Sequence, residues 1–223
     1  MCIRDSLTSA QGAQLPAFLT VLAGSLAGDQ HVALTELQSL SANIDHIKEI
    51  VAMQQSYARM AAVIEAVSPA SLVESALQLN EAALGRHSVE VIREYAETPL
   101  LEVDKHKALQ ILVNLIRNAK QAMAAVRVED RRLTLRISSE DDAMVKIAVA
   151  DAGVGIPGEN LARLFEHGFT TRAEGHGFGL HSAALAAKET GGALTAHSDG
   201  PGRGAVFTLL LPLHAPQSPA KKL

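Results

Sequence analysis

Apolar residues recur at helical spacing along the first part of the chain. Between positions 31 and 65, a repeat of three and four residues is kept by Leu37, Leu40, Ile44, Ile47, Val51, Gln54, Ala58 and Ala61. This spacing predicts a long helix whose seam packs against another helix, either within its own domain or in a hairpin that dimerises. Residues 1–30 lack the repeat, although Pro16 favours a short helix there and Gly28-Asp29 favours a turn.

The pattern changes after Ser68-Pro69, where we place a domain boundary. Ser71 is the expected N-cap of an amphipathic helix. Its apolar positions are Leu72, Val73, Ala76, Leu77 and Leu79. Two short strands are expected next, at 89–96 and 100–103.

The rest of the chain alternates between helical and strand patterns. A strong helix is predicted over 104–125, with Asp104 as its N-cap, and apolar residues alternate with polar or small ones over 133–138 and 145–150. A helix over 180–190 and a strand on either side of 199–202 follow. Hairpin strands interspersed with helices predict an α+β fold in which one layer of helices covers a mixed sheet.

Composition narrows the function classes. The 223 residues carry 20 Lys and Arg against 24 Asp and Glu, for a formal net charge of −4. This balance, with few aromatic residues and no basic cluster, argues against a nucleic-acid groove. The single cysteine, Cys2, excludes an internal disulfide, and no apolar run reaches the ~18–20 residues of a membrane span. We therefore expect a cytoplasmic chain that makes no membrane contact.

One face of the predicted helix 104–125 is polar but mostly uncharged. The apolar face would hold Leu109, Leu112, Val113, Ile116 and Met123, and the opposite face Lys107, Gln110, Asn114, Asn118 and Gln121. Asparagine is a poor helix former, so two of them one turn apart invite an explanation. Their side-chain oxygens suit a hard cation such as Mg²⁺ beside phosphate oxygens, whereas the alternative is an ordinary solvated face.

Asp151 follows a predicted strand and precedes Gly153 and Gly155. Its carboxylate can accept a hydrogen bond from an exocyclic amine, and the glycines let the backbone approach a flat ligand; an ordinary turn is the alternative. Residues 153–158 also fit the spacing Gly-x-Gly-x-x-Gly of dinucleotide-binding folds. The acidic residue at the required distance, Glu174, follows no apolar strand, so we reject that interpretation.

Glycines also alternate directly before the predicted helix 180–190. They are Gly175, Gly177 and Gly179. Backbone N–H groups at a helix N-terminus suit an anion such as a triphosphate, and a flexible surface loop is the alternative. Upstream lie Thr170, Thr171 and Arg172, which add possible phosphate contacts. No Gly-Lys dipeptide occurs in the chain, which excludes the Walker-type phosphate loop.

Five short motifs thus follow one another along the chain. They are Asn114-Leu115-Ile116-Arg117-Asn118-Ala119, Asp151-x-Gly-x-Gly, Leu164 to Arg172, Gly175-x-Gly-x-Gly-Leu180, and Gly202 to Phe207. Their order resembles that of the N, G1, F, G2 and terminal glycine boxes of sensor histidine kinases. These kinases belong to the superfamily of gyrase, heat-shock chaperone, histidine kinase and mismatch-repair ATPases. The resemblance covers residues 72–213.

The resemblance implies a two-layer α/β sandwich of the Bergerat type that binds ATP and Mg²⁺. It assigns Asn118 to the metal, with Asn114 beside it in a catalytic pair, and Asp151 to the adenine amine. Gly153 and Gly155 would line the base and ribose. The other implied nucleotide contacts are Phe169, Thr170, Thr171, Arg172, Gly175, Gly177, Phe178, Gly179 and Leu180.

Two differences from the superfamily bear on chemistry. Hydrolytic members carry a Glu one turn before the metal-binding Asn, where this chain has Asn114, so there is no obvious base to activate water. Transfer of phosphate is therefore favoured over hydrolysis. Kinases of this type often carry Asn or Thr after the G1 aspartate, where this chain has Ala152, and we expect only a modest weakening of nucleotide binding.

A phosphoacceptor box, a His followed by Glu, Asp or Asn on a helix, is not found among the early histidines. Neither His31-Val32 nor His46-Ile47 matches it. The helical repeat resembles instead the second helix of a dimerisation and phosphotransfer hairpin, whose first helix would lie upstream. Met1 to Ser6 resembles a translated adapter prefix. We therefore expect the chain to be a fragment.

The expected layout has four parts. Residues 1–30 are poorly defined, 31–67 form the second hairpin helix, 68–213 form the ATP-binding catalytic domain, and 214–223 form a disordered tail. The implied function is transfer of the ATP γ-phosphate to a histidine, for relay to an aspartate of a response-regulator receiver domain, within a homodimer. The alternatives are a superfamily ATPase driven by nucleotide-dependent dimerisation and a non-catalytic scaffold module.

Overall fold

The computed structural model describes most of the chain after position 63 and part of its beginning. The described residues are 18–30, 32–34, 36–37, 64–141, 143–171 and 177–214. The chain divides into two compact units, Met1–Gln54 and Gln55–Leu223. Most of the predicted helical seam, from Leu40 to Ala61, lies outside the described residues, as does most of the predicted tail.

The described residues of the first unit are helical. Their helix continues through Gly28 and Asp29, so the turn predicted there is wrong. A single glycine lowers helix stability by only about 1 kcal/mol, and the good helix formers Leu26 and Ala27 precede it.

The first described element of the second unit is a strand that the helical repeat concealed. Strand β1 (Ile64–Val67) pairs antiparallel with β3 (Leu101–Asp104), so Ile64 and Glu65 do not extend the predicted helix. The β-branched Ile64 and Val67 favour extended backbone. These four residues therefore belong with the strands that follow, and not with the predicted hairpin helix 31–67.

The next two helices along the chain, which are separated by strands, both have a side-chain cap. Helix α3 (Pro69–Arg86) is capped by Ser68, whose Oγ accepts from the N–H of Ser71 at 3.1 Å, so the predicted cap at Ser71 is wrong by three positions. Proline at the first helical position fits this assignment, because its ring sets the helical φ angle. Helix α4 (Lys105–Ala122) is capped by Asp104, as predicted from the sequence.

The main sheet has five strands in the order β2-β4-β5-β7-β6. They are β2 (Glu90–Tyr95), β4 (Arg132–Ser139), β5 (Met144–Asp151), β7 (Ala205–Pro212) and β6 (Ala193–His197). The β2–β4 pair is parallel and the other pairs are antiparallel. Short helices η2 (Val128–Asp130) and α5 (Gly158–Leu161) lie in the connections.

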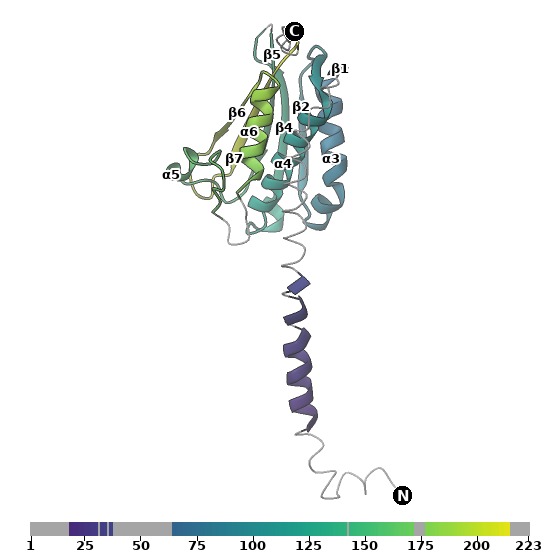
Figure 1. Ribbon diagram of the computed structural model, residues 1–223, viewed down its shortest axis with the longest axis vertical. Helices are drawn as coiled ribbons and strands as arrows, with labels where there is room; N and C mark the ends of the chain where they lie inside the picture. The colour runs from purple at the N-terminus through teal and green to yellow at the C-terminus, as the bar shows by residue number, and fades with distance from the viewer. Residues whose placement is uncertain are drawn as a thin grey trace, which may run out of the picture. The chain divides into compact units, whose positions relative to one another are not determined.

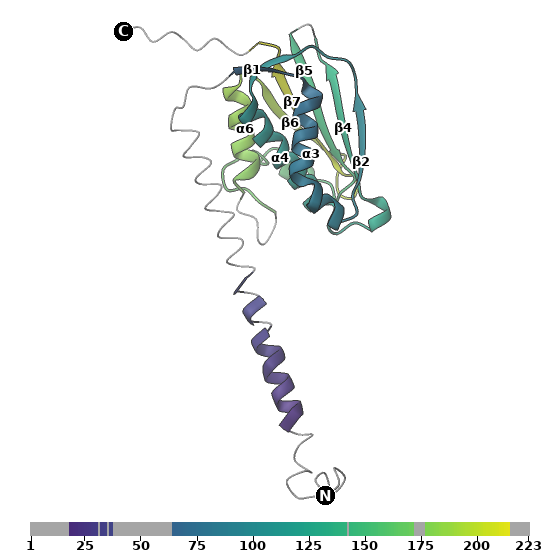
Figure 2. The same cartoon turned by 90° about the vertical axis from the view of Figure 1, so that its right-hand side faces the viewer.

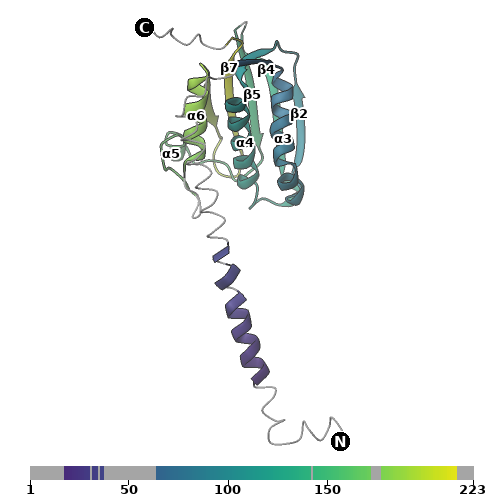
Figure 3. The same cartoon turned by 45° about the vertical axis from the view of Figure 1, so that its right-hand side comes forward.

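Helices α3, α4 and α6 (Gly179–Glu189) cover one face of this sheet (Figures 1 and 2). Helix α4 lies between α3 and α6 and contacts both (Figure 3). The arrangement confirms the predicted α+β fold with one helical layer on a mixed sheet.

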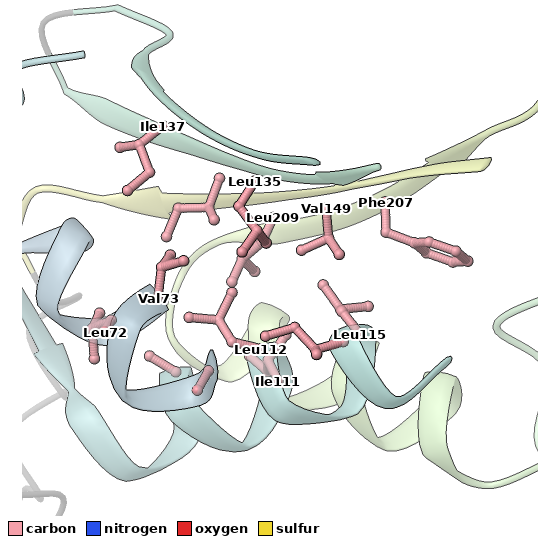
Figure 4. Packing of buried hydrophobic residues seen from close by; sticks show 14 of the residues in the cluster. Leu72, Val73, Ile111, Leu112, Leu115, Leu135, Ile137, Val149, Phe207 and Leu209 are labelled. Atoms are coloured by element: carbon pink, nitrogen blue, oxygen red, sulfur yellow. The ribbon is translucent and has the colours of Figure 1, made fainter. Parts of the chain in front are cut away.

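The core fills the space between α4 and the sheet. Ile111, Leu112 and Leu115 of α4 point toward Val149 and Leu209 of the central strands (Figure 4). The apolar face predicted for α4 is partly wrong, because Ile111 and Leu115 are fully buried whereas Leu109 and Val113 are only partly buried. A helix flanked by two others and a sheet buries a wider sector than the stripe expected for a surface helix.

A polar cluster ties the edge strand β2 to helix α3. The carboxylate of Glu74 accepts from Arg93 Nε at 2.7 Å and Nη2 at 3.2 Å, and from the Tyr95 hydroxyl at 2.9 Å. The hydrogen bonds from Arg93 hold the pKa of Glu74 below its ordinary value. Burial of the hydroxyl, together with its bond to Glu74, raises the pKa of Tyr95.

None of the helices in the described ranges combines the length and the apolar character needed to cross a bilayer.

Truncation of the core should lower stability strongly. Leu112 is 0% exposed between α4 and the sheet, whereas Leu79 on α3 is 67% exposed. We expect Leu112→Ala to reduce the free energy of unfolding by about 2–5 kcal/mol. The same change at Leu79 should stay within about 0.5 kcal/mol. Urea unfolding followed by circular dichroism measures both, and equal losses would contradict the packing described.

The Glu74 cluster should make stability depend on pH. Because the folded pKa of Glu74 is depressed, its contribution is present above the ordinary value of 4.5 and is lost as the pH falls through the folded value. Wild type should therefore exceed Glu74→Gln in unfolding free energy near neutral pH, and the difference should shrink at about pH 3. Urea titrations at both pH values measure this. A difference that does not change with pH would show that the carboxylate charge contributes nothing.

Candidate functional site

Two asparagines on α4 are linked in series to the first residue of α6. Nδ2 of Asn114 donates to the carbonyl oxygen of Gly179. Nδ2 of Asn118 donates to Oδ1 of Asn114 at 3.3 Å. A backbone carbonyl only accepts, so the first bond fixes the orientation of the Asn114 amide, and the second then fixes that of Asn118. Oδ1 of Asn118 is thereby turned away from Asn114.

Helix α6 changes the surroundings of this face of α4. Lys107 near the start of α4 forms an ion pair with Glu189 at the end of α6, with Nζ 2.6 Å from Oε2. Together with the bond from Asn114 to Gly179, this pair shows that the two helices run antiparallel side by side. Asn114 and Asn118 are consequently half-buried, so the ordinary solvated face considered from the sequence does not describe them.

Asp151 is the last residue of β5 and is only 7% exposed. Its cross-strand partners are Leu133 and Ala205, both buried beneath the helices. Residues directly opposite one another share a face of the sheet, so the carboxylate lies on the helix-covered side. Its Oδ1 accepts from the N–H of Gly153 at 2.9 Å. A carboxylate held in this way at a strand end is a strong acceptor for a donor on a ligand.

The loop after Asp151 is held by backbone hydrogen bonds from two sides. The N–H of Val154 donates to the carbonyl of Ala122 at the end of α4 at 3.1 Å. From the β6–β7 connection, Gly204 N–H donates to the Gly153 carbonyl at 3.2 Å, and Gly202 N–H to the Val154 carbonyl at 2.6 Å. Ala122 is one helical turn beyond Asn118. The loop therefore contacts the same end of α4 as the amide series, by which we mean the hydrogen-bonded side chains of Asn114 and Asn118.

Gly155 is the position in this loop that most clearly requires glycine. Its φ angle is +71°, in the left-handed region. A Cβ atom there would also overlap the carbonyl oxygen of Gly200. The sequence signal of alternating glycines after Asp151 therefore has a structural cause, which is close approach of two backbones.

The segment that resembles the F box contacts α6 and its N-cap residue Phe178 through one backbone carbonyl and one histidine ring. Nδ1 of His181 donates to the Phe165 carbonyl at 2.8 Å. The ring centroid of His167 lies 4.7 Å from that of Phe178 and 5.1 Å from that of His181. The sequence singled out neither histidine: His167 entered only as part of the segment Leu164 to Arg172, and His181, a lone histidine on a helix, carries no spacing signal.

The other residues predicted to contact the nucleotide differ in their exposure and surroundings. The Arg163 guanidinium carbon lies 4.6 Å from the centre of the half-buried Phe169 ring, and Thr170 and Thr171 are exposed. Leu180 packs its side chain against the core. Arg172 and Gly175 lie outside the described residues.

An open cavity of about 510 Å³ lies beside the loop after Asp151. Its lining residues are Val126, Asp130, Arg132, Ala152, Gly153, Val154, Gly202, Arg203 and Gly204. It shares Gly153 with the predicted site but includes neither asparagine nor the Asp151 carboxylate, and its two arginines are exposed. The cavity therefore overlaps the predicted site only at Gly153.

The amide oxygen of Asn118 suits a cation only if a bound ligand supplies further oxygen atoms. In the described part of the chain, no three His, Cys, Asp or Glu side chains come together in a group that could hold a metal ion. Mg²⁺ is usually bound by one or two protein oxygens together with substrate phosphates and water. A single oriented amide oxygen fits that mode and does not fit a metal cage built by the protein alone.

Curated relatives of the chain are sensor kinases. Sensor histidine kinase ZraS of Klebsiella oxytoca is 32% identical over 168 residues, which cover 70% of this chain and 35% of the relative. Sensor protein FixL of Bradyrhizobium diazoefficiens is 31% identical over 172 residues, covering 76% and 32%. The chain thus spans about a third of the length of these relatives.

Solved structures share the fold of the second unit. The catalytic domain of histidine kinase ThkA superposes with a TM-score of 0.60 at 23% identity, over 68% of this chain and 96% of that one. Full-length ShkA in complex with AMPPNP gives a TM-score of 0.58 at 24% identity, over 71% and 33%.

The fold and the family match together define a Bergerat-type ATP-binding domain. Residues 103–215 match the family model of histidine kinase-, DNA gyrase B- and HSP90-like ATPases. The chain belongs to this family, and its second unit is an ATP-binding catalytic domain of the kind found in sensor histidine kinases.

Substitution of Gly155 should disturb the loop that follows Asp151. Gly155→Ala places a Cβ against Gly200 at a left-handed φ angle, so we expect a loss of about 1–3 kcal/mol in unfolding free energy. Gly158→Ala is the matched control, because nothing lies within 4 Å of the added Cβ. Thermal unfolding of both variants measures the effect. A neutral Gly155→Ala would contradict the close approach of the two backbones.

Proposed function

We propose that this chain binds ATP with Mg²⁺ and supplies the γ-phosphate for transfer to a histidine, as part of a sensor histidine kinase. The observation that carries the proposal is the series of hydrogen bonds that links the Gly179 carbonyl to the Asn114 side-chain amide and that amide to Asn118. It presents one oriented oxygen, Oδ1 of Asn118, at the end of α4 that also holds the Asp151 loop. Family membership and the sensor kinase relatives support it.

Asp151 is the proposed reader of the base. A buried carboxylate can only accept hydrogen bonds, and the 6-amino group of adenine donates one. Guanine carries a carbonyl at that position, which leaves two acceptors facing each other. Because an unsatisfied buried polar group costs about 1–3 kcal/mol, Asp151 should favour ATP over GTP. Gly153 and Gly155 let the backbone approach the base and ribose.

Asn118 is the proposed metal ligand, through Oδ1. Bound Mg²⁺ would neutralise charge on the β- and γ-phosphates. The N-terminus of α6, an 11-residue helix that begins at Gly179, offers backbone N–H groups to the same phosphates. The further proposed nucleotide contacts are Phe169, Thr170, Thr171, Arg172, Gly175, Gly177, Phe178 and Leu180.

Transfer is favoured over hydrolysis by the chemistry at position 114. In the proposed reaction, the bond from the γ-phosphorus to its bridging oxygen breaks, ADP leaves, and a phosphorus–nitrogen bond forms on an imidazole. Activation of water would require a general base, and the side-chain amide of Asn114 cannot act as one. Its Nδ2 is also committed to Gly179. A superfamily ATPase is the second candidate, and it requires steady phosphate release.

The proposed role in a sensor histidine kinase also implies partners for the parent protein. None of the 9 histidines in this chain is followed by Glu, Asp or Asn, so we propose that the acceptor histidine is presented by another segment or polypeptide. The residues before β1, from position 31 to 63, would contribute to a homodimeric helical hairpin. The phosphate would then pass to an aspartate of a receiver domain.

Nucleotide binding tests the proposal. Isothermal titration of the full chain with AMPPNP should show affinity that Mg²⁺ strengthens. Asn118→Ala should remove that strengthening, a loss of about 10- to 100-fold. Asp151→Asn should erase the preference for adenine over guanine nucleotides. Gln110→Ala, at an exposed position on the same helix, is the control and should change nothing.

The outcomes separate the candidates. Absence of nucleotide binding by wild type would overturn the proposal and favour a scaffold module. Binding with steady phosphate release from ATP would favour the ATPase.

A further inference from the structure

We propose that Ser198 is a positioning residue for the nucleotide site, and that its hydroxyl holds the Asp151 loop in its binding conformation. Ser198 directly follows β6 and opens the turn that leads to β7. The inference rests on the proposed function, since it concerns how that site is kept in shape.

The hydroxyl of Ser198 uses its full hydrogen-bonding capacity. It donates to the Gly204 carbonyl at 2.6 Å and accepts from the N–H groups of Ile156 at 3.0 Å and Gly200 at 3.3 Å. One donor and two acceptor sites are all that a hydroxyl has. The Ile156 bond crosses from the β6–β7 connection to the far end of the Asp151 loop.

The same hydroxyl also holds the near end of that loop, through Gly204. Gly204 has a φ angle of +68°, and a Cβ atom on it would overlap the Asp151 carbonyl oxygen. Its N–H donates to the Gly153 carbonyl at 3.2 Å. Ser198 therefore fixes both ends of the segment from Asp151 to Ile156, one directly and one through Gly204.

Within this segment, Val154 is held by backbone bonds to Ala122 and Gly202, whereas the N–H of Ile156 is held by the Ser198 hydroxyl. Residues 152–157 form neither helix nor strand, so their backbone groups depend on such irregular bonds. Loss of the hydroxyl would leave the N–H of Ile156 without its acceptor and would let the loop sample other conformations. The folded protein would then bind nucleotide more weakly, because part of the binding energy would be used to order the loop.

Three variants test the inference against a purely structural role. Ser198→Ala removes the hydroxyl, and Ser198→Thr retains it. Thr190→Val is the control, because it removes a different internally bonded hydroxyl, which donates to the Ala187 carbonyl at 2.8 Å at the far end of α6. For each folded variant, the Kd for MgAMPPNP and the melting temperature are measured. Hydrogen exchange of the peptide covering 152–157 is recorded alongside them.

We expect Ser198→Ala to raise the Kd about tenfold and to speed exchange in 152–157, while exchange in α4 stays slow. Ser198→Thr should restore most of the affinity. Thr190→Val should lower the melting temperature and leave the Kd within about twofold of wild type.

Two results would overturn the inference while leaving the proposed function intact. One is a wild-type Kd in Ser198→Ala, and the other is an equal weakening in Thr190→Val. If wild type itself binds no nucleotide, the proposed function fails and the inference fails with it.

Discussion

The hydrogen bond from the Asn114 amide to the Gly179 carbonyl is the contact on which the site depends. It joins the middle of α4 to the first residue of α6, and it leaves the Asn114 side chain one orientation. Asn118 then has one orientation as well, because its Nδ2 must face the Asn114 oxygen. In the proposed site, a single backbone carbonyl thus decides which atom of Asn118 is offered to a cation. Preorganisation of this kind removes a cost that a ligand would otherwise bear on binding.

The other half of the site is built mostly from backbone. Asp151 supplies the carboxylate, but its loop is shaped by bonds to the Ala122 carbonyl, to two glycines of the β6–β7 connection and to Ser198. Close approach of two backbones excludes side chains, which explains the glycine content better than flexibility does. The sheet end can therefore hold a flat base against main chain while the central strands remain a tightly packed core.

Sequence patterns predicted the fold well where burial is one-sided. Alternation along β4 and β5, and the Asp104 cap of α4, follow directly from local rules of side-chain direction and end capping. Sequence patterns failed where the environment of a residue depends on an element that is distant in the sequence. The half-burial of Asn114 and Asn118 depends on α6, and β1 depends on pairing with β3. Asn118 and Asp151 could be proposed from motif order, whereas Ser198 became visible only once Ile156 and Gly204 were brought to its hydroxyl.

A structure of the full chain with Mg²⁺ and AMPPNP would test the central claim most directly. We expect Oδ1 of Asn118 to lie about 2.0–2.1 Å from the metal, the usual Mg²⁺–oxygen distance, with Nδ2 still directed to Asn114. We also expect the adenine amine on the Asp151 carboxylate. A metal bound without Asn118, or an Asn118 amide turned away from Asn114, would contradict the claim that the amide series orients the ligand.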